Sequence, residues 1–147
     1  MVEQTSLAKQ KVQVEMLSYG RYSDWDSSSK ELPQIQQFTQ EIPVAVGTEF
    51  GYILEICKGK GQTLDFIIEH PPFKDKSGKT APPFKGSLII PTNAYSFFLG
   101  DCIWEPVDDK TGTWTLTTKI EGEVVARKSF DMVPAEVSAP AGQENSS

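Results

Sequence analysis

Hydrophobic and polar residues alternate one by one along most of the chain. This period of two places hydrophobic side chains on one face of a β-strand and polar side chains on the other. The run at residues 48–58 shows it most clearly, with Phe50, Tyr52, Leu54 and Ile56 at alternate positions. Comparable runs recur at short intervals, and no amphipathic helix of useful length separates them. The pattern predicts an all-β fold, an immunoglobulin-like antiparallel β-sandwich of about seven strands.

Irregularities in the alternation predict where the strands bend and turn. Residues 12–22 change phase at Leu17, just before Gly20, which predicts a bulge or a bend. The turn Gly59-Lys60-Gly61 joins the run at 48–58 to a second alternating run at 63–69, which predicts a β-hairpin. Further strands are expected near residues 88–90, 95–99, 112–120 and 123–132. The expected core face of the last one consists of Val124, Ala126, Phe130 and Met132.

The segment 34–42 fits two patterns. Its Ile35, Phe38 and Ile42 are spaced three and four apart, as on a helix, but Pro33 and Pro43 enclose it closely. An irregular strand and a single helical turn both remain open. We expect one domain over residues 12–133, between a flexible N-terminus at 1–11 and a disordered tail at 134–147.

The acidic charge balance argues against one class of partner. The 147 residues include 20 Asp and Glu against 14 Lys and Arg, for a net charge of −6. Binding to phosphate backbones needs clustered Lys and Arg, so we expect no nucleic-acid partner. The N-terminus lacks the apolar stretch of a secretory signal, and the longest apolar runs are too short to span a bilayer. We therefore expect a cytoplasmic protein without a membrane partner.

Neither the cysteines nor the acidic loop predicts a metal site. Cys57 and Cys102 could pair across two sheets, but a reducing cytoplasm favours two buried thiols. There is no CxxC pattern and only one histidine, so we expect no metal and no cofactor. The acidic loop does not match an EF-hand, and we expect it to be solvated and pinned by a buried Trp104. Its carboxylates are those of Asp101, Glu105, Asp108 and Asp109.

The connection at residues 70–86 contains the tripeptide Pro-Pro-Phe twice. Ser77-Gly78 lies midway between the copies, so a chain that turns there brings two stiff proline arms alongside each other. In one interpretation both phenylalanines pack under the loop as a brace, as long ordered loops generally require. In the other, the arms form a rigid apolar surface that binds a partner at low ordering cost. The residues of that surface are Pro72, Phe73, Pro83 and Phe84.

The single histidine, His70, would be the general base if the chain were an enzyme. Its candidate partners are the carboxylates of Glu69, Asp75, Asp101 and Glu105. No serine or cysteine adjoins His70 in a nucleophile motif, so a small hydrolase or metal-dependent enzyme is the alternative hypothesis. Such a site requires His70 to face a pocket, within about 3 Å of a carboxylate.

The tryptophans are expected in different surroundings. Trp114 alternates in phase with Leu116 and Ile120 and is expected in the core. Trp25 lies between two aspartates in a polar loop, so we expect it to be exposed and a candidate binding residue.

Three parts of the chain resemble a known family. They are ELPQIQQFTQEIPVAVGTEFGYIL at residues 31–54, the two Pro-Pro-Phe copies, and FFLGDCIWEP at residues 97–106 followed by Gly112-Thr113-Trp114. Together they are similar to DUF3859, a family of bacterial domains of unknown function, over residues 14–133. The resemblance implies a bacterial source, and it brings no reaction, ligand or catalytic residue. Cys57 and Cys102 are not part of the resembling pattern.

These observations favour a non-enzymatic binding or interaction module over an enzyme. The partner would be another protein or a second copy of the chain, bound through an exposed surface or sheet edge. The candidate binding residues are Phe73, Phe84, Pro72, Pro83, Trp25, Trp104 and His70.

Overall fold

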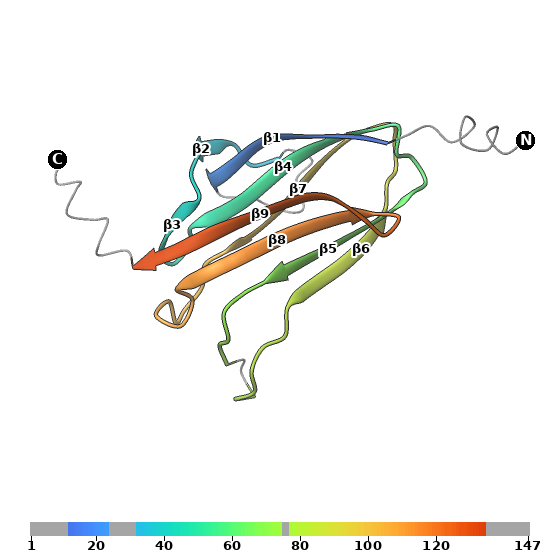
Figure 1. Ribbon diagram of the computed structural model, residues 1–147. Helices are drawn as coiled ribbons and strands as arrows, with labels where there is room; N and C mark the ends of the chain where they lie inside the picture. The colour runs from blue at the N-terminus through green and yellow to red at the C-terminus, as the bar shows by residue number, and fades with distance from the viewer. Residues whose placement is uncertain (1–11, 24–31, 75–76, 135–147) are drawn as a thin grey trace, which may run out of the picture.

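The computed structural model describes residues 12–23, 32–74 and 77–134, which form nine strands and no helix. One sheet has the strand order β2-β1-β4-β7 and the other β3-β9-β8-β5-β6. Figure 1 shows them as two layers. The predicted all-β sandwich is confirmed, with nine strands instead of about seven. The strands are β1 (Gln13–Tyr22), β2 (Ile35–Gln37), β3 (Glu41–Val44), β4 (Glu49–Cys57), β5 (Thr63–Glu69), β6 (Phe84–Ile89), β7 (Ala94–Cys102), β8 (Gly112–Ile120) and β9 (Glu123–Pro134).

The two additional strands come from the segment that fitted two patterns. β2 pairs antiparallel with the end of β1, and β3 pairs parallel with β9. Pro43 lies within β3, which is an edge strand, and the missing amide of a proline is tolerated there. The segment is therefore extended, without a helical turn.

The hairpin predicted from Gly59-Lys60-Gly61 is wrong. β4 pairs with β1 and β7, whereas β5 pairs with β6 and β8 in the other sheet. Because neighbours occupy both edges of β4, the chain after Cys57 has to cross to the second layer. A local turn motif cannot distinguish this crossing from a hairpin.

Two bulges change which side chains face the core. The register of β1 on β4 jumps between Met16 and Ser18, which confirms the bend predicted at Leu17. A second jump, between Thr118 and Lys119 of β8, shifts β9 so that Val125 packs against the core. Val124 is instead 54% exposed, and its predicted core position is wrong.

The core fills the space between the sheets. Trp114 is fully buried, as predicted, and its ring meets that of Phe50 edge to face at 5.5 Å. The hydroxyl groups of Tyr52 and Thr118 lie 2.7 Å apart and hydrogen bond across the layers. Burial raises the pKa of Tyr52 to about 12. The core therefore contains a satisfied polar pair as well as apolar side chains.

A row of three glycines crosses the four-stranded sheet. Gly20, Gly51 and Gly100 are register partners on β1, β4 and β7. A Cβ atom on Gly51 would overlap the carbonyl oxygen of Leu99, and its φ of +152° also favours glycine. The backbones approach closely at this row, and β7 continues from it into Asp101 and the loop of Trp104.

Candidate functional site

The two Pro-Pro-Phe arms lie side by side where β5 ends and β6 begins, as predicted. The amide of Ala81 donates to the carbonyl oxygen of Phe73 at 2.8 Å, and Lys74 forms a β-bridge with Thr80. Gly78, in the turn between the arms, has a φ of +85°. In Figure 1 this connection extends away from the sandwich below β5 and β6. Pro72 and Pro83 are exposed on it.

His70 ties the two arms together. Its Nδ1 lies 2.8 Å from the carbonyl oxygen of Pro71, and its Nε2 lies 2.9 Å from that of Pro82. Carbonyl oxygens only accept hydrogen bonds, so the ring bonds to both arms at once only when both of its nitrogens carry a proton, as in the imidazolium form. The ring also stacks on Phe73, with centroids 4.3 Å apart. Within the described residues the hydrogen bonds of His70 go to carbonyls, and nothing here favours the enzyme alternative; Asp75 lies outside those residues.

Aromatic rings from three segments meet beneath the arms. Phe73 is 6% exposed, whereas Phe84 and Trp104 are half-buried. The Trp104 ring lies 5.6 Å from Phe73 and 6.1 Å from Phe84 between centroids. The fold thus brings together four of the predicted binding residues, His70, Phe73, Phe84 and Trp104. Trp25 lies outside the described residues.

Lys110 completes this cluster, and the sequence reasoning missed it. Its side chain is 1% exposed, and its Nζ lies 4.5 Å above the Phe73 ring and 4.7 Å above the Trp104 ring. The Nζ donates to the carbonyl oxygen of Pro106 at 2.9 Å and to Asp109 Oδ1 at 2.7 Å. Its charge is therefore both paired and covered by aromatic faces. In the sequence the lysine belongs to DDKTG, which has the composition of an exposed turn.

A cavity of about 350 Å³, here called the arm pocket, opens beside this cluster. Aromatic rings form much of its wall, and two exposed charged side chains, of Lys74 and Glu105, lie on its rim. Such a pocket suits an apolar side chain with polar groups around it. The lining residues are Phe73, Lys74, Ala81, Phe84, Trp104, Glu105, Pro106 and Lys110.

A second cavity of about 390 Å³, the Asp101 hollow, shares Phe84 and Trp104 with the arm pocket. Asp101 accepts a hydrogen bond from the amide of Cys102 at 2.8 Å. Burial raises the pKa of the Asp101 carboxyl, and the Cys102 amide and the charge of His70 offset this only in part. The lining residues are Phe66, Ile68, Phe84, Gly100, Asp101 and Trp104.

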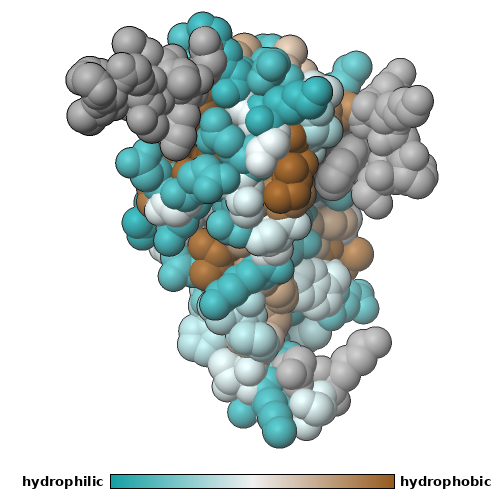
Figure 2. All heavy atoms as spheres, turned by 90° about the vertical axis from the view of Figure 1, so that its right-hand side faces the viewer, coloured by the Kyte–Doolittle hydropathy of each residue, from teal (hydrophilic) through white to brown (hydrophobic). Residues whose placement is uncertain are grey.

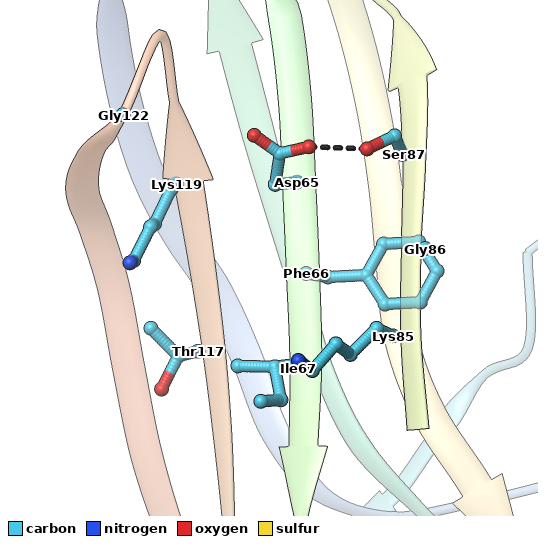
Figure 3. Close-up of a pocket in the computed structure, with 9 residues that line it drawn as sticks. All are labelled: Asp65, Phe66, Ile67, Lys85, Gly86, Ser87, Thr117, Lys119 and Gly122. Atoms are coloured by element: carbon cyan, nitrogen blue, oxygen red, sulfur yellow. Dashed lines mark hydrogen bonds between the residues drawn. The ribbon is translucent and has the colours of Figure 1, made fainter. Parts of the chain in front are cut away.

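A third cavity, of about 500 Å³, is formed by β5, β6 and β8. Figure 3 shows Lys85 and Lys119 over the strands and the carboxylate of Asp65 bonded to Ser87. The ring of Phe66 lies against Gly86, where a Cβ atom would overlap it. Charges of both signs line this cavity, so they favour no single class of ligand.

The remaining surface features add little. Figure 2 shows hydrophobic residues on one face of the molecule in separate spots among hydrophilic ones. Cys57 and Cys102 lie at opposite ends of the β4–β7 pair, about 26 Å apart by strand length, which is too far for a disulfide between them. Among the described residues, no group of three His, Cys, Asp or Glu side chains could hold a metal ion. In the same part of the chain, no helix has the length and apolar character to cross a membrane.

Comparisons with known proteins agree on family and fold. The family model described as "Domain of unknown function (DUF3859)" matches residues 10–132. No curated protein matches the chain. The structure resembles that of an immunoglobulin-like protein from Pseudomonas aeruginosa, with a TM-score of 0.70 and 23% identity over 86% of this chain and 99% of the other. A weaker likeness, with a TM-score of 0.45 and 13% identity, is to an alkylpurine DNA glycosylase from Pseudomonas fluorescens, over 86% of this chain and 32% of the other.

Proposed function

The chain belongs to the DUF3859 family, and we propose that it is a non-enzymatic interaction module that binds a protein partner through the arm pocket. Neither the family nor the immunoglobulin-like fold assigns an activity, so the proposal is based on the site alone. The contact residues are Phe84 and Trp104 in the pocket wall and the exposed Pro72 and Pro83 on the arms beside it, with Phe73 and His70 as their support. The partner inserts an apolar side chain between the rings.

The observation that carries this proposal is that the aromatic walls of the pocket are held in place before any partner arrives. Prolines fix the arms, His70 bonds to a carbonyl on each of them, and Lys110 lies over Phe73 and Trp104. A rigid site loses little conformational entropy on binding. Tryptophan and other aromatic residues in such pockets commonly dominate the binding free energy.

A photo-crosslinking amino acid at Pro83 tests the proposal in extract of the source organism. Pro83 is exposed and adjoins Phe84 of the pocket wall, so we expect a specific product from this position. We expect none from the same group at Val124, which is exposed on β9 opposite Lys119, at the other end of β8 from the Lys110 turn. Phe84→Ala should abolish the product. Ile89→Ala is the matched control, since Ile89 is exposed on the same strand and should leave it unchanged.

Three outcomes decide the matter. A crosslink to a second copy of the chain would identify self-association, and light scattering would then show a dimer. Products of equal yield from Pro83 and Val124 would contradict a site at the arm pocket. So would a product that persists in Phe84→Ala while circular dichroism shows that this variant is folded.

A further inference from the structure

The Asp101 hollow lies beside the arm pocket, at the edge of the sandwich where β6 and β7 are the outermost strands. β5 supplies Phe66 and Ile68, β6 supplies Phe84, and β7 supplies Gly100 and Asp101. Trp104, from the loop after β7, also lines the arm pocket. A partner that fills the arm pocket therefore reaches the hollow with a neighbouring side chain.

The charge of the hollow is negative, and the charge of His70 compensates it only in part. Among its lining residues, all of them described, Asp101 is the only charged one. Within the described residues, the Cys102 amide is the only hydrogen-bond donor to this carboxylate. A half-buried carboxylate in mostly apolar surroundings is costly to ionise, and burial raises the pKa of Asp101 accordingly. A cation bound in the hollow would offset the free-energy cost of ionising Asp101.

The walls are suited to a cation as well. Phe66, Phe84 and Trp104 are aromatic, and ring faces attract ammonium and guanidinium groups within about 6 Å. The protein already uses one of these rings in this way, since the Nζ of Lys110 lies 4.7 Å from the Trp104 centroid. Lys110 pairs with Asp109 at 2.7 Å, and the positive charge that acts on Asp101 is that of His70.

We propose that the Asp101 hollow binds the basic side chain of an arginine or lysine in the protein partner, next to the apolar side chain in the arm pocket. Asp101 pairs with the cation, and Phe84 and Trp104 cover it. The proposal rests on the proposed function, and it adds the chemistry of the partner: an apolar residue followed closely by a basic one.

Titration of the full chain with N-acetyl-arginine methylamide, followed by NMR, tests the hollow without the partner. We expect saturable shifts of the Cys102 amide and the Trp104 indole N–H. The citrulline analogue, which has the same shape without the charge, should bind at least about tenfold more weakly. Asp101→Asn should weaken arginine binding by a similar factor, whereas Asp131→Asn, on β9, should not. Equal binding of the two analogues, no saturable shift, or an unchanged Asp101→Asn variant would each overturn the proposal.

Crosslinking from Pro83 separates this proposal from the proposed function. We expect Asp101→Asn to reduce the product by at least about tenfold, and the crosslinked segment to contain an Arg or Lys close to the site of attachment. A product lost in Phe84→Ala but unchanged in Asp101→Asn would leave the arm pocket standing and refute the hollow. No product from Pro83 in any variant would refute the interaction module, and the partner cation with it.

Discussion

The ammonium nitrogen of Lys110 lies 4.5 Å from the centroid of the Phe73 ring. This contact joins the turn before β8 to the first Pro-Pro-Phe arm. The backbone of Lys110 is also fixed, because its carbonyl oxygen accepts a hydrogen bond from Trp114 Nε1 at 2.9 Å. The arm is thus anchored, through one lysine, to the largest ring of the core.

Replacement of Lys110 by methionine should lower the free energy of unfolding by about 2 kcal/mol, measured by urea denaturation. Methionine keeps the apolar stem, so the loss reports on the ammonium group. Asp109→Asn should lower the free energy of unfolding by less, because Asp109 is partly exposed. The double variant should lower it by less than the sum of the two single variants. A change below about 0.5 kcal/mol in Lys110→Met would show that the ammonium contacts contribute little.

His70→Ala should loosen the arms without unfolding the sandwich. The variant loses both hydrogen bonds to the arms and the stacking on Phe73. Amide hydrogen exchange should therefore accelerate at Ala81, whose N–H bonds to Phe73 across the arms. The amide of Glu121, bonded to Thr63 between β5 and the β8–β9 turn, is the internal control. Equal acceleration at both amides would indicate global destabilisation instead.

Asp101→Asn should stabilise the protein at neutral pH, raising the Tm by a few degrees. Burial raises the folded-state pKa of Asp101 above its ordinary value, so the carboxyl favours folding only while it is protonated. That contribution is complete below about pH 4 and is lost as the pH rises through the folded-state pKa. The advantage of the asparagine should therefore vanish in acid. Thermal denaturation from pH 3 to 7 measures the difference in Tm between Asp101→Asn and the wild type. A difference that does not depend on pH would rule out desolvation of Asp101 as its cause.

Two buried tyrosines should limit stability in alkali. Burial raises the pKa of both Tyr22 and Tyr52 from 10.0 to about 12. The contribution of the protonated tyrosines to the free energy of unfolding is complete below pH 10. It is lost as the pH rises toward 12, by up to about 1.4 kcal/mol per pH unit for each tyrosine. Tyr52→Phe should make the decline shallower, although at pH 7 it costs about 1 kcal/mol through the lost bond to Thr118. Urea denaturation between pH 7 and 11 checks this, and identical slopes in the two proteins would contradict it.

Local patterns in the sequence predicted the features that depend on neighbouring residues. The alternation of Phe50, Tyr52 and Leu54 identified a strand, and the phase change at Leu17 identified a bulge, because both reflect which side of one strand faces the core. The symmetry of the two Pro-Pro-Phe copies about Ser77-Gly78 likewise predicted that the arms would pair.

Features that depend on distant segments could not be predicted in this way. Gly59-Lys60-Gly61 resembles a hairpin turn, and only the occupation of both β4 edges by β1 and β7 shows that the chain must change sheets. The phase of Val124 depends on a bulge that alternation alone does not reveal. The burial of Lys110 depends on the ring of Phe73, which is far from it in the sequence and meets Trp104 of its own loop only in the folded chain.

The parallel pairing of β3 with β9 determines when the sandwich closes during synthesis. Ile42 of β3 pairs with Met132, and the carbonyl of Gln40 accepts from the amide of Asp131 at 2.7 Å. A ribosome translates β3 early, but the strand has no partner in its sheet until residues 131–134 have left the exit tunnel. Such non-local pairing slows folding and leaves strand edges unpaired in the nascent chain. This edge of the five-stranded sheet is therefore completed only after nearly all of the described chain has been made.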